Sequence, residues 1–260
     1  MSPAEPQTDT TYELLYWPSI PGRGEFVRLA FEITGTPYRD VSNEQEDGVQ
    51  EMTSLISSKS TSSSPLFAPP LLRVSHPGAE GKLVIHQTPN ILIFLAGKLG
   101  LDGGNNEASQ AVARQIMLTA LDLNNEAHDT HHPVALMEYY EDQKDEALKK
   151  AIDFRKNRIP KFFGYFERAL KANDSTGHGK YLVGDKASIA DIVVWQVLDG
   201  LKFAFPKEIS AREKEFPVLY GTFYPAFKDQ AGIKEYLASS RRMKYSHGVF
   251  RYYPELDRQD

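Results

Sequence analysis

Over the first hundred residues, the spacing of apolar side chains changes repeatedly between a strand-like and a helix-like period. Residues 12–17 form a short aromatic run typical of a β-strand, and prolines and glycines follow it. Residues 24–34 place apolar side chains along one stripe of a helix. The other elements of this half are expected as strands at 37–41, 68–74 and 82–86 and helices at 44–56 and 87–98. The order β-α-β-α-β-β-α predicts a compact α/β domain over residues 12–100.

Strand-like patterns almost disappear after the glycine- and asparagine-rich linker at residues 100–106. The helices expected beyond it lie at residues 108–123, 147–170 with a kink at Pro160, 192–198, 216–227 and 231–239. The segment at 192–198 is apolar on nearly every side, which predicts a buried central helix. An irregular tail follows the last helix. We therefore expect a larger, all-helical domain over residues 107–260.

Composition narrows the possible functions further. The chain has 260 residues, of which 41% are hydrophobic, and no run approaches the ~18 apolar residues of a membrane span. A net charge of −5 argues against a nucleic-acid partner. The polar residues 1–11 lack a signal-peptide pattern, so we expect a disordered tail on a cytoplasmic protein. Cysteine is absent, so any thiol chemistry must use a sulfur atom supplied by the substrate.

Two segments of the first domain combine turn residues with groups that could bind a ligand. Tyr16 ends the first strand, where its hydroxyl could donate to an anion, although it could also be an ordinary strand aromatic. The glycines of residues 22–24 resemble only part of a phosphate-binding loop. Ala68-Pro69-Pro70 could enter an edge strand in the trans form, or a cis bond could expose the Ala68 backbone.

Two further segments have the pattern of helix starts. Gln87 or Thr88 occupies an N-cap position before Pro89, so we expect capping there, and the helix N-terminus could also bind a carboxylate. Ser188 and Asp191 have the spacing of a capping box, which is a folding signal rather than a catalytic pair.

These features, in this order and spacing, resemble the cytosolic glutathione S-transferase family over essentially the whole chain after its N-terminal tail. The most specific motifs are Tyr16-Trp17-Pro18 with Arg23 and Arg28, Ala68-Pro69-Pro70-Leu71, Gln87-Thr88, and Tyr181-Leu182-Val183-Gly184-Asp185 before the capping box. The tyrosine-type start is most similar to the mu, pi and sigma classes. The resemblance implies a thioredoxin-like first domain, a cis bond at Ala68–Pro69, a helical second domain and a homodimer.

The family's activity, carried onto this chain, is the conjugation of glutathione thiolate to hydrophobic electrophiles, in detoxification or secondary metabolism. The resemblance implies that Tyr16 stabilises the thiolate, with Ser19 as the alternative hydroxyl. It implies neither a metal nor a tightly bound cofactor. The residues expected to bind glutathione are Arg23, Lys59, Ala68, Pro69, Gln87, Thr88 and, across the dimer, Asp122.

Two departures from the family pattern affect this assignment. One more residue separates Tyr16 from Arg23 than in the pi pattern, so the loop between them could differ. A tryptophan that mu- and pi-like members often carry in the second helix region is absent. A glutathione-dependent isomerase and a non-catalytic glutathione-binding protein stay open as alternatives, and the presence of Tyr16 favours catalysis.

The segment His128-Asp129-Thr130-His131-His132 places three imidazoles and a carboxylate within five residues. Such a cluster could bind zinc, but the HExxH pattern is absent and no second segment supplies obvious ligands. We therefore expect no metal. Because the family places this stretch near its electrophile pocket, the resemblance implies that His128, His131 and His132, with Tyr139 or Tyr140, line that pocket.

Overall fold

The computed structural model describes residues 10–58, 64–76 and 81–259 and contains a four-stranded sheet of order β2-β1-β3-β4. The strands are β1 (Thr11–Leu15), β2 (Arg39–Asp40), β3 (Leu71–Ser75) and β4 (Leu83–His86). β2 runs parallel to β1, whereas β3 is antiparallel to both of its neighbours. Leu15 lies opposite Leu71 in the β1–β3 pair, so the two prolines before Leu71 stand level with Tyr16 at the end of β1.

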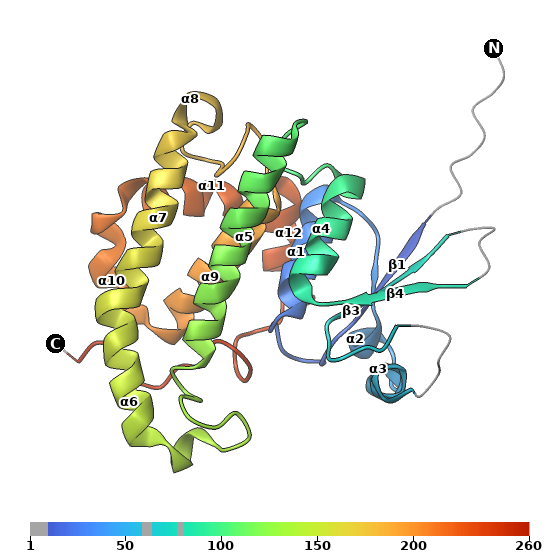
Figure 1. The fold of residues 1–260 in the computed structure, drawn as a ribbon, viewed down its shortest axis with the longest axis horizontal. Coiled ribbons are helices and arrows are strands. Elements are labelled where there is room, and N and C mark those ends of the chain that lie inside the picture. The colour runs from blue at the N-terminus through green and yellow to red at the C-terminus, as the bar shows by residue number, and fades with distance from the viewer. Residues whose placement is uncertain (1–9, 59–63, 77–80, 260) are drawn as a thin grey trace.

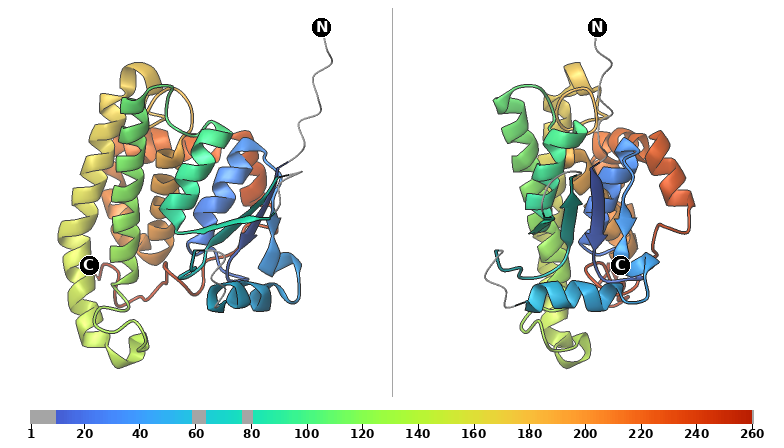
Figure 2. Two further views of the ribbon diagram at one scale, coloured as in Figure 1. Left: turned by 45° about the vertical axis from the view of Figure 1, so that its right-hand side comes forward. Right: turned by 90° about the vertical axis from the view of Figure 1, so that its right-hand side faces the viewer.

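Alternate side chains of the central strands serve two separate cores. Leu14 and Leu72 pack with helices α1 (Gly24–Thr34) and α4 (Thr88–Leu99), whereas Leu15 and Leu71 pack on the other face. That second face carries α2 (Val41–Glu44) and α3 (Gly48–Ser57). Both faces are covered, and the charged side chains on the second face, Glu13 and Arg73, form an ion pair. α1 and α4 lie between the sheet and the long helices (Figures 1 and 2).

The second half of the chain is helical in the residues that the structure describes. Its longer helices are α5 (Glu107–His128), α6 (Lys144–Asp153), α7 (Ile159–Ala172) and α9 (Ile189–Ala204). The shorter ones are α8 (Asp174–Gly177), α10 (Pro206–Arg212), α11 (Tyr224–Lys228) and α12 (Ala231–Ala238). Single 3-10 turns at Tyr140–Asp142 and Glu213–Glu215 and π-helical turns at Phe154–Arg158 and Leu219–Phe223 complete the set.

The fold class predicted from the sequence is confirmed, and most expected helices are present. α1 has the predicted bounds, and α9 is buried on nearly all sides, as its apolar composition indicated. The helix expected at 44–56 is instead two short helices, with Gln45 extended after the first. The kink expected at Pro160 takes the form of the π-helical turn Phe154–Arg158, because a proline lacks the N–H that would bind the carbonyl four residues earlier.

The cis bond lies one residue later than the family resemblance implied. It joins Pro69 to Pro70, not Ala68 to Pro69, and β3 begins at Leu71 rather than at Ala68. Pro70 is buried next to the strand, whereas Ala68 and Pro69 are half-buried in the bend. Two consecutive prolines offer two candidate bonds, and the motif alone does not distinguish between them.

The capping box at the start of α9 is confirmed. The Ser188 N–H donates to Asp191 Oδ2 at 2.8 Å, and the buried Leu182 N–H donates to Asp191 Oδ1 at 2.7 Å. Burial raises the pKa of the Asp191 carboxyl to about 6, although the Ser188 and Leu182 donors oppose that shift. The same carboxylate therefore fixes the first turn of the central helix and the loop before it.

The irregular tail predicted after α12 is present and crosses the molecule below α5 to the far side (Figure 1). Arg242 in this tail pairs with Glu25 of α1 and with Asp199 of α9. No helix among the described residues has the length and apolar character of a membrane span. Most of the N-terminal tail, residues 1–9, lies outside the described residues.

Candidate active site

Tyr16 follows β1 directly, and its ring is only 6% exposed. Its hydroxyl oxygen accepts a hydrogen bond of 2.9 Å from the Arg23 N–H, at the residue that precedes α1. Among the described residues, no group accepts a hydrogen bond from the Tyr16 hydroxyl. The proton of a fixed phenol is thus available to an incoming acceptor.

Two glycines make room for this ring. A Cβ at Gly22 would lie 2.3 Å from the Tyr16 hydroxyl oxygen, and one at Gly24 would lie 2.7 Å from ring carbons. Gly22 also has φ of 47°, a conformation that glycine adopts without strain. The two glycines of Gly22-Arg23-Gly24 therefore leave space for the Tyr16 ring. This requirement, rather than phosphate binding, explains the partial phosphate-loop pattern.

Two arginine charges lie near Tyr16, and one of them, Arg28, is ion-paired. Burial raises the pKa of the Tyr16 phenol, while the Arg23 N–H and the Arg28 and Arg23 charges act in the opposite direction. Arg28 is buried, forms ion pairs with Asp40 at 2.6 Å and Glu25 at 3.1 Å, and lies 5.9 Å from the Tyr16 ring centroid. The phenol therefore keeps its proton at neutral pH and can act as a donor.

Ser19, the alternative hydroxyl, lies in a different environment. It is exposed, its φ is 63°, and its N–H donates to Asn43 Oδ1 at 3.1 Å. Ser19 lines a surface pocket with Tyr38 and Arg241, and Tyr16 does not line that pocket. The hydroxyls of Tyr16 and Ser19, which the sequence left as alternatives, thus lie in different surroundings.

The start of α4 departs from the capping expected there. Gln87 occupies the N-cap position with φ of 70°, and its side chain makes no cap hydrogen bond. The Thr88 side chain is 1% exposed, and its Oγ1 has no hydrogen-bond partner among the described residues. Side-chain capping by Gln87 or Thr88 was therefore the wrong expectation. Free N–H groups and an unpartnered hydroxyl are what a carboxylate ligand requires.

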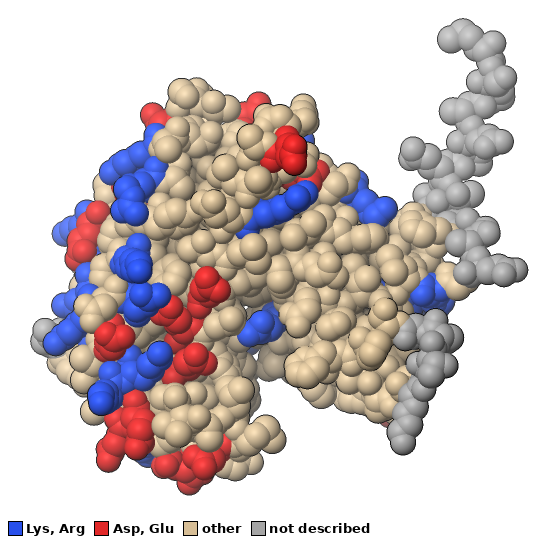
Figure 3. Space-filling view, in the orientation of Figure 1, with Lys and Arg blue, Asp and Glu red and all other residues tan. Residues whose placement is uncertain are grey.

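The remaining predicted glutathione-binding residues are spread over the loop after β1 and over α5. Arg23 donates through Nη2 to Asn125 Oδ1 of α5 at 2.7 Å. Asp122 lies one turn earlier on the same helix and is exposed. Lys59 lies outside the described residues. Figure 3 shows a notch between the two halves of the molecule. The Arg23–Asn125 hydrogen bond joins the segment before α1 to α5.

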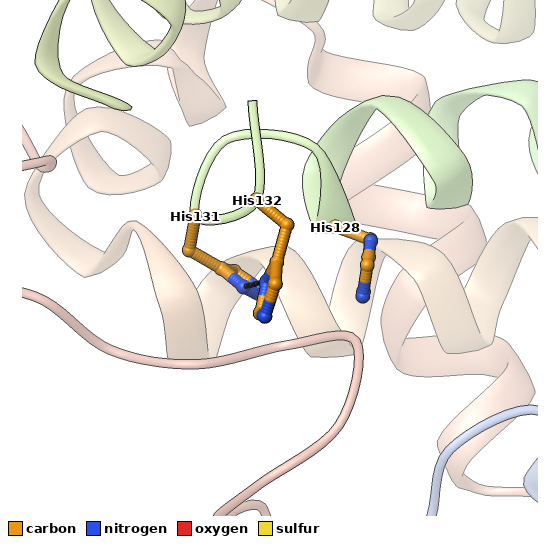
Figure 4. A group of neighbouring side chains, drawn as sticks. All are labelled: His128, His131 and His132. Carbon is orange, nitrogen blue, oxygen red and sulfur yellow. Dashed lines mark hydrogen bonds between the residues drawn. The ribbon is translucent and has the colours of Figure 1, made fainter. Parts of the chain in front are cut away.

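The three predicted histidines converge at the end of α5 (Figure 4). His131 is buried, and its Nδ1 lies 2.6 Å from Nδ1 of the half-buried His132. The His128 ring is stacked on that of His132, with centroids 4.9 Å apart. Burial lowers the pKa of all three imidazoles, that of His131 to about 3. The cluster is therefore neutral at physiological pH.

The two candidate tyrosines differ in their surroundings. Tyr139 is 75% exposed, so it could contact a second substrate. Tyr140 is buried, stacks on Tyr253 with centroids 3.9 Å apart, and donates from its hydroxyl to Glu255 at 2.7 Å. Tyr140 thus holds the C-terminal tail in place, and Tyr139 is the one open to solvent.

Sequence reasoning missed two contacts and one unpartnered polar atom at this site. Asn125 binds Arg23, and its spacing of three residues from His128 on one helix face was a signal that could have revealed it. His86, next to Gln87, has a buried Nδ1 without a partner among the described residues. The Val249 carbonyl contacts His131 across 118 positions of sequence, and no local pattern indicates such a contact.

Comparisons with known proteins agree with this architecture. A family model described as glutathione S-transferase, C-terminal domain, matches residues 128–240. A glutathione S-transferase of Dirofilaria immitis is 30% identical, covering 90% of this chain and 95% of the relative. Glutathione S-transferase P 1 of Xenopus laevis is 27% identical, with 90% and 94% covered. The solved Pi-class enzyme of Onchocerca volvulus is 26% identical with a TM-score of 0.63, over 87% of this chain and 92% of that chain.

Proposed function

Because this chain belongs to the glutathione S-transferase family, we propose that Tyr16 activates the thiol of its co-substrate glutathione. The protein is a glutathione transferase, which joins the sulfur of glutathione to an electrophilic substrate. The observation that supports the role of Tyr16 is its fixed hydroxyl, which accepts from the Arg23 N–H and has a free proton to donate.

The proposed step is stabilisation of an anion. A free cysteine thiol titrates near ~8.5, and only its thiolate is a good nucleophile. A hydrogen bond to a charged acceptor contributes about 1.5–3 kcal/mol. Since one pKa unit corresponds to about 1.4 kcal/mol, the Tyr16 O–H···S⁻ bond accounts for a lowering of the thiol pKa by about one to two units. The thiolate then attacks the electrophile, and the leaving group departs.

Glutathione itself is proposed to lie along the edge formed by the start of α4 and the bend before β3. Gln87 and Thr88 supply N–H groups and a hydroxyl to the γ-glutamyl carboxylate. Ala68 and Pro69 contact the cysteinyl backbone, where Ala68 offers an N–H and a carbonyl and Pro69 only a carbonyl. Arg23 and Lys59 are the proposed cationic partners of the carboxylates.

The finer assignments are also proposals. We propose a homodimer in which Asp122 of the second copy completes the glutathione site, supported by its exposure on α5.

Hydrophobic electrophiles are proposed to bind beside the histidines and Tyr139, in a detoxification role. Since the cytosol keeps glutathione reduced, we propose the cytoplasm as the compartment. Residues 12–100 are the proposed glutathione-binding domain, and residues 107–260 the electrophile-binding domain.

The experiment that tests the role of Tyr16 is a titration of bound glutathione, followed by the ultraviolet absorbance of its thiolate. We expect a thiol pKa below that of free glutathione in the wild type and a rise of about one to two units in Tyr16→Phe. The pH profile of kcat/KM should shift in the same direction, because the thiolate is the reacting form.

The matched control is Ser19→Ala, which removes the other hydroxyl of this loop and should leave the thiol pKa unchanged. A depressed pKa that persists in Tyr16→Phe but is lost in Ser19→Ala would transfer the role to Ser19. A wild-type thiol pKa equal to that of free glutathione would refute thiol activation by this protein.

A further inference from the structure

The ligand nitrogens of His128, His131 and His132 all lie within 4.8 Å of one another. These residues come from the end of α5 and the turn that follows it, and their rings face a common space above the C-terminal tail (Figure 4). Sequence spacing alone predicted no metal here, because a second ligand-bearing segment was missing. The structure shows that the turn folds back, so one segment brings three imidazoles together.

The tail orients the central imidazole. His131 Nε2 lies 2.9 Å from the carbonyl oxygen of Val249, and a carbonyl can only accept, so Nε2 carries the proton. The neutral ring of His131 then has its lone pair on Nδ1, which faces His132. Metal-binding histidines characteristically donate their second nitrogen to a carbonyl or carboxylate in this way. His131, the most buried of the three, is thus held in the tautomer whose Nδ1 lone pair can bind a metal.

The spacing of the nitrogens also suits a small ion. Zinc–imidazole bonds of about 2.0–2.1 Å in a tetrahedron place neighbouring ligand nitrogens about 3.3 Å apart. The His131–His132 pair, at 2.6 Å, is closer than this, and no pair exceeds 4.8 Å. His128 and His132 are both only half-buried, so their side chains are less confined than that of the buried His131.

We propose that His128, His131 and His132 form a three-imidazole site for a divalent transition-metal ion such as Zn²⁺. Imidazole nitrogen suits zinc, copper and nickel, whereas Mg²⁺ and Ca²⁺ require oxygen ligands. The proposal departs from the sequence-based expectation of no metal, and it is independent of the thiol activation assigned to Tyr16.

The three-histidine site lies where a bound ion could contact the electrophilic substrate. Three protein ligands leave one tetrahedral position for water or for an oxygen of a bound molecule. His128 lies one helical turn after Asn125, which binds Arg23 in the loop that follows Tyr16. The ion would therefore lie at the end of α5, near the region proposed for electrophiles.

The test is a Co²⁺ titration of the full chain without a histidine tag, followed by the visible d–d absorbance and by displacement with Zn²⁺. We expect one equivalent of Co²⁺ with the intense bands of a four-coordinate site. His128→Asn and His132→Asn each remove one half-buried ligand and should weaken binding at least about ten-fold, since even loss of an outer-shell partner costs about 10–100-fold.

The matched control is His178→Asn, at an isolated histidine with φ of 50°, a conformation that asparagine tolerates. It should bind Co²⁺ as the wild type does. Thermal unfolding followed by circular dichroism verifies that each variant is folded. The proposal is overturned if the wild type binds no stoichiometric Co²⁺, or if the double variant of His128 and His132 binds it as tightly as the wild type.

Discussion

At the scale of single residues, the position of the Tyr16 hydroxyl depends on neighbours that carry no functional group of their own. The ring is bounded by Gly22 and Gly24, and its oxygen is held by the Arg23 N–H at 2.9 Å. Because the hydroxyl accepts that bond, its own proton points elsewhere. The orientation of the donor is therefore a property of the loop backbone.

The Gly24→Ala substitution tests this dependence. Gly24 has an ordinary helical backbone, but a Cβ there would lie 2.7 Å from the Tyr16 ring, so the ring must move. A displacement of about 1 Å in a catalytic group can reduce the rate by up to about a hundred-fold. We expect kcat/KM for conjugation to fall ten- to a hundred-fold and the bound thiol pKa to rise. Steady-state kinetics and the thiolate titration measure both.

Gly221→Ala is the matched control, because the Cβ that it would add has no neighbour within 4 Å beyond the adjacent backbone. It should retain full activity and unfold at the same or a slightly higher temperature. An unchanged rate in Gly24→Ala would show that the tyrosine ring does not depend on this glycine.

At single residues, position in the fold could be predicted where the local motif is unambiguous, whereas the role of Tyr16 stays a proposal. Tyr16 could be singled out because it stands between a strand and a turn, and the capping pair of Ser188 and Asp191 could be recognised from its spacing. The cis bond implied by the family resemblance was one residue too early, because Pro69 and Pro70 are adjacent and the motif does not distinguish their two bonds.

At the scale of secondary-structure elements, the N-terminus of α4 is the strongest candidate for carboxylate binding. The helix begins at Thr88 without a side-chain cap, and the Thr88 hydroxyl is buried without a partner among the described residues. Leaving such groups unsatisfied costs free energy, and a ligand carboxylate would satisfy them. The start of α4 therefore offers unsatisfied groups that a bound carboxylate would use.

Thr88→Val tests this, since it keeps the shape of the side chain and removes the hydroxyl. A hydrogen bond to a charged group contributes about 1.5–3 kcal/mol, so the Kd for glutathione should rise at least about ten-fold. Thr88→Ser retains the hydroxyl and should restore most of the affinity. Equilibrium titration of glutathione measures both variants, and equal affinity for valine and serine would exclude a ligand contact at Thr88.

Element existence was predicted better than element boundaries. The apolar stripes of α1 and α9 were visible because each pattern continues for several turns. The two-residue strand β2 and the division between α2 and α3 depend on packing against the sheet edge and give little periodic signal. Short elements contain too few residues to show a period.

At the scale of the whole molecule, a buried ion-pair network joins the two halves of the chain. Glu25 of α1 is fully buried and binds Arg28, Arg242 of the tail and the Tyr236 hydroxyl of α12. Arg242 also binds Asp199 of α9 at 2.8 Å. Burial acts to raise the pKa of Glu25, but the Arg242 and Arg28 charges outweigh it and lower that pKa.

Arg242→Met should therefore destabilise the fold, because Glu25 loses one of its two cationic partners inside the protein. Breaking a buried pair typically costs about 3–5 kcal/mol, and Arg28 remains, so we expect a value near the lower end. The neighbouring Arg241 is exposed and pairs with Glu32, which also accepts a hydrogen bond from Tyr38, so Arg241→Met should cost less than Arg242→Met. Urea unfolding of the two variants measures the difference.

The same network sets a direction for pH dependence. Since the fold lowers the pKa of Glu25, its ionised form stabilises the native state at neutral pH. That contribution is lost as the pH falls below the ordinary carboxyl value of 4.5. Glu25→Gln should therefore show a smaller loss of stability than the wild type when acidified. An equal loss in both would remove Glu25 from the acid response.

The sequence by itself determined the order of elements, the α/β-then-helical architecture, the tyrosine at the end of β1 and the requirement for a borrowed thiol. These features follow from periodicity, turn residues and composition, all of which are local or additive along the chain. Only the tertiary structure decided which proline bond is cis, that Tyr16 and Ser19 lie in different environments, and that the tail contacts both His131 and Glu25. Such contacts join residues far apart in sequence, so strand register and packing decide them rather than any pattern along the chain.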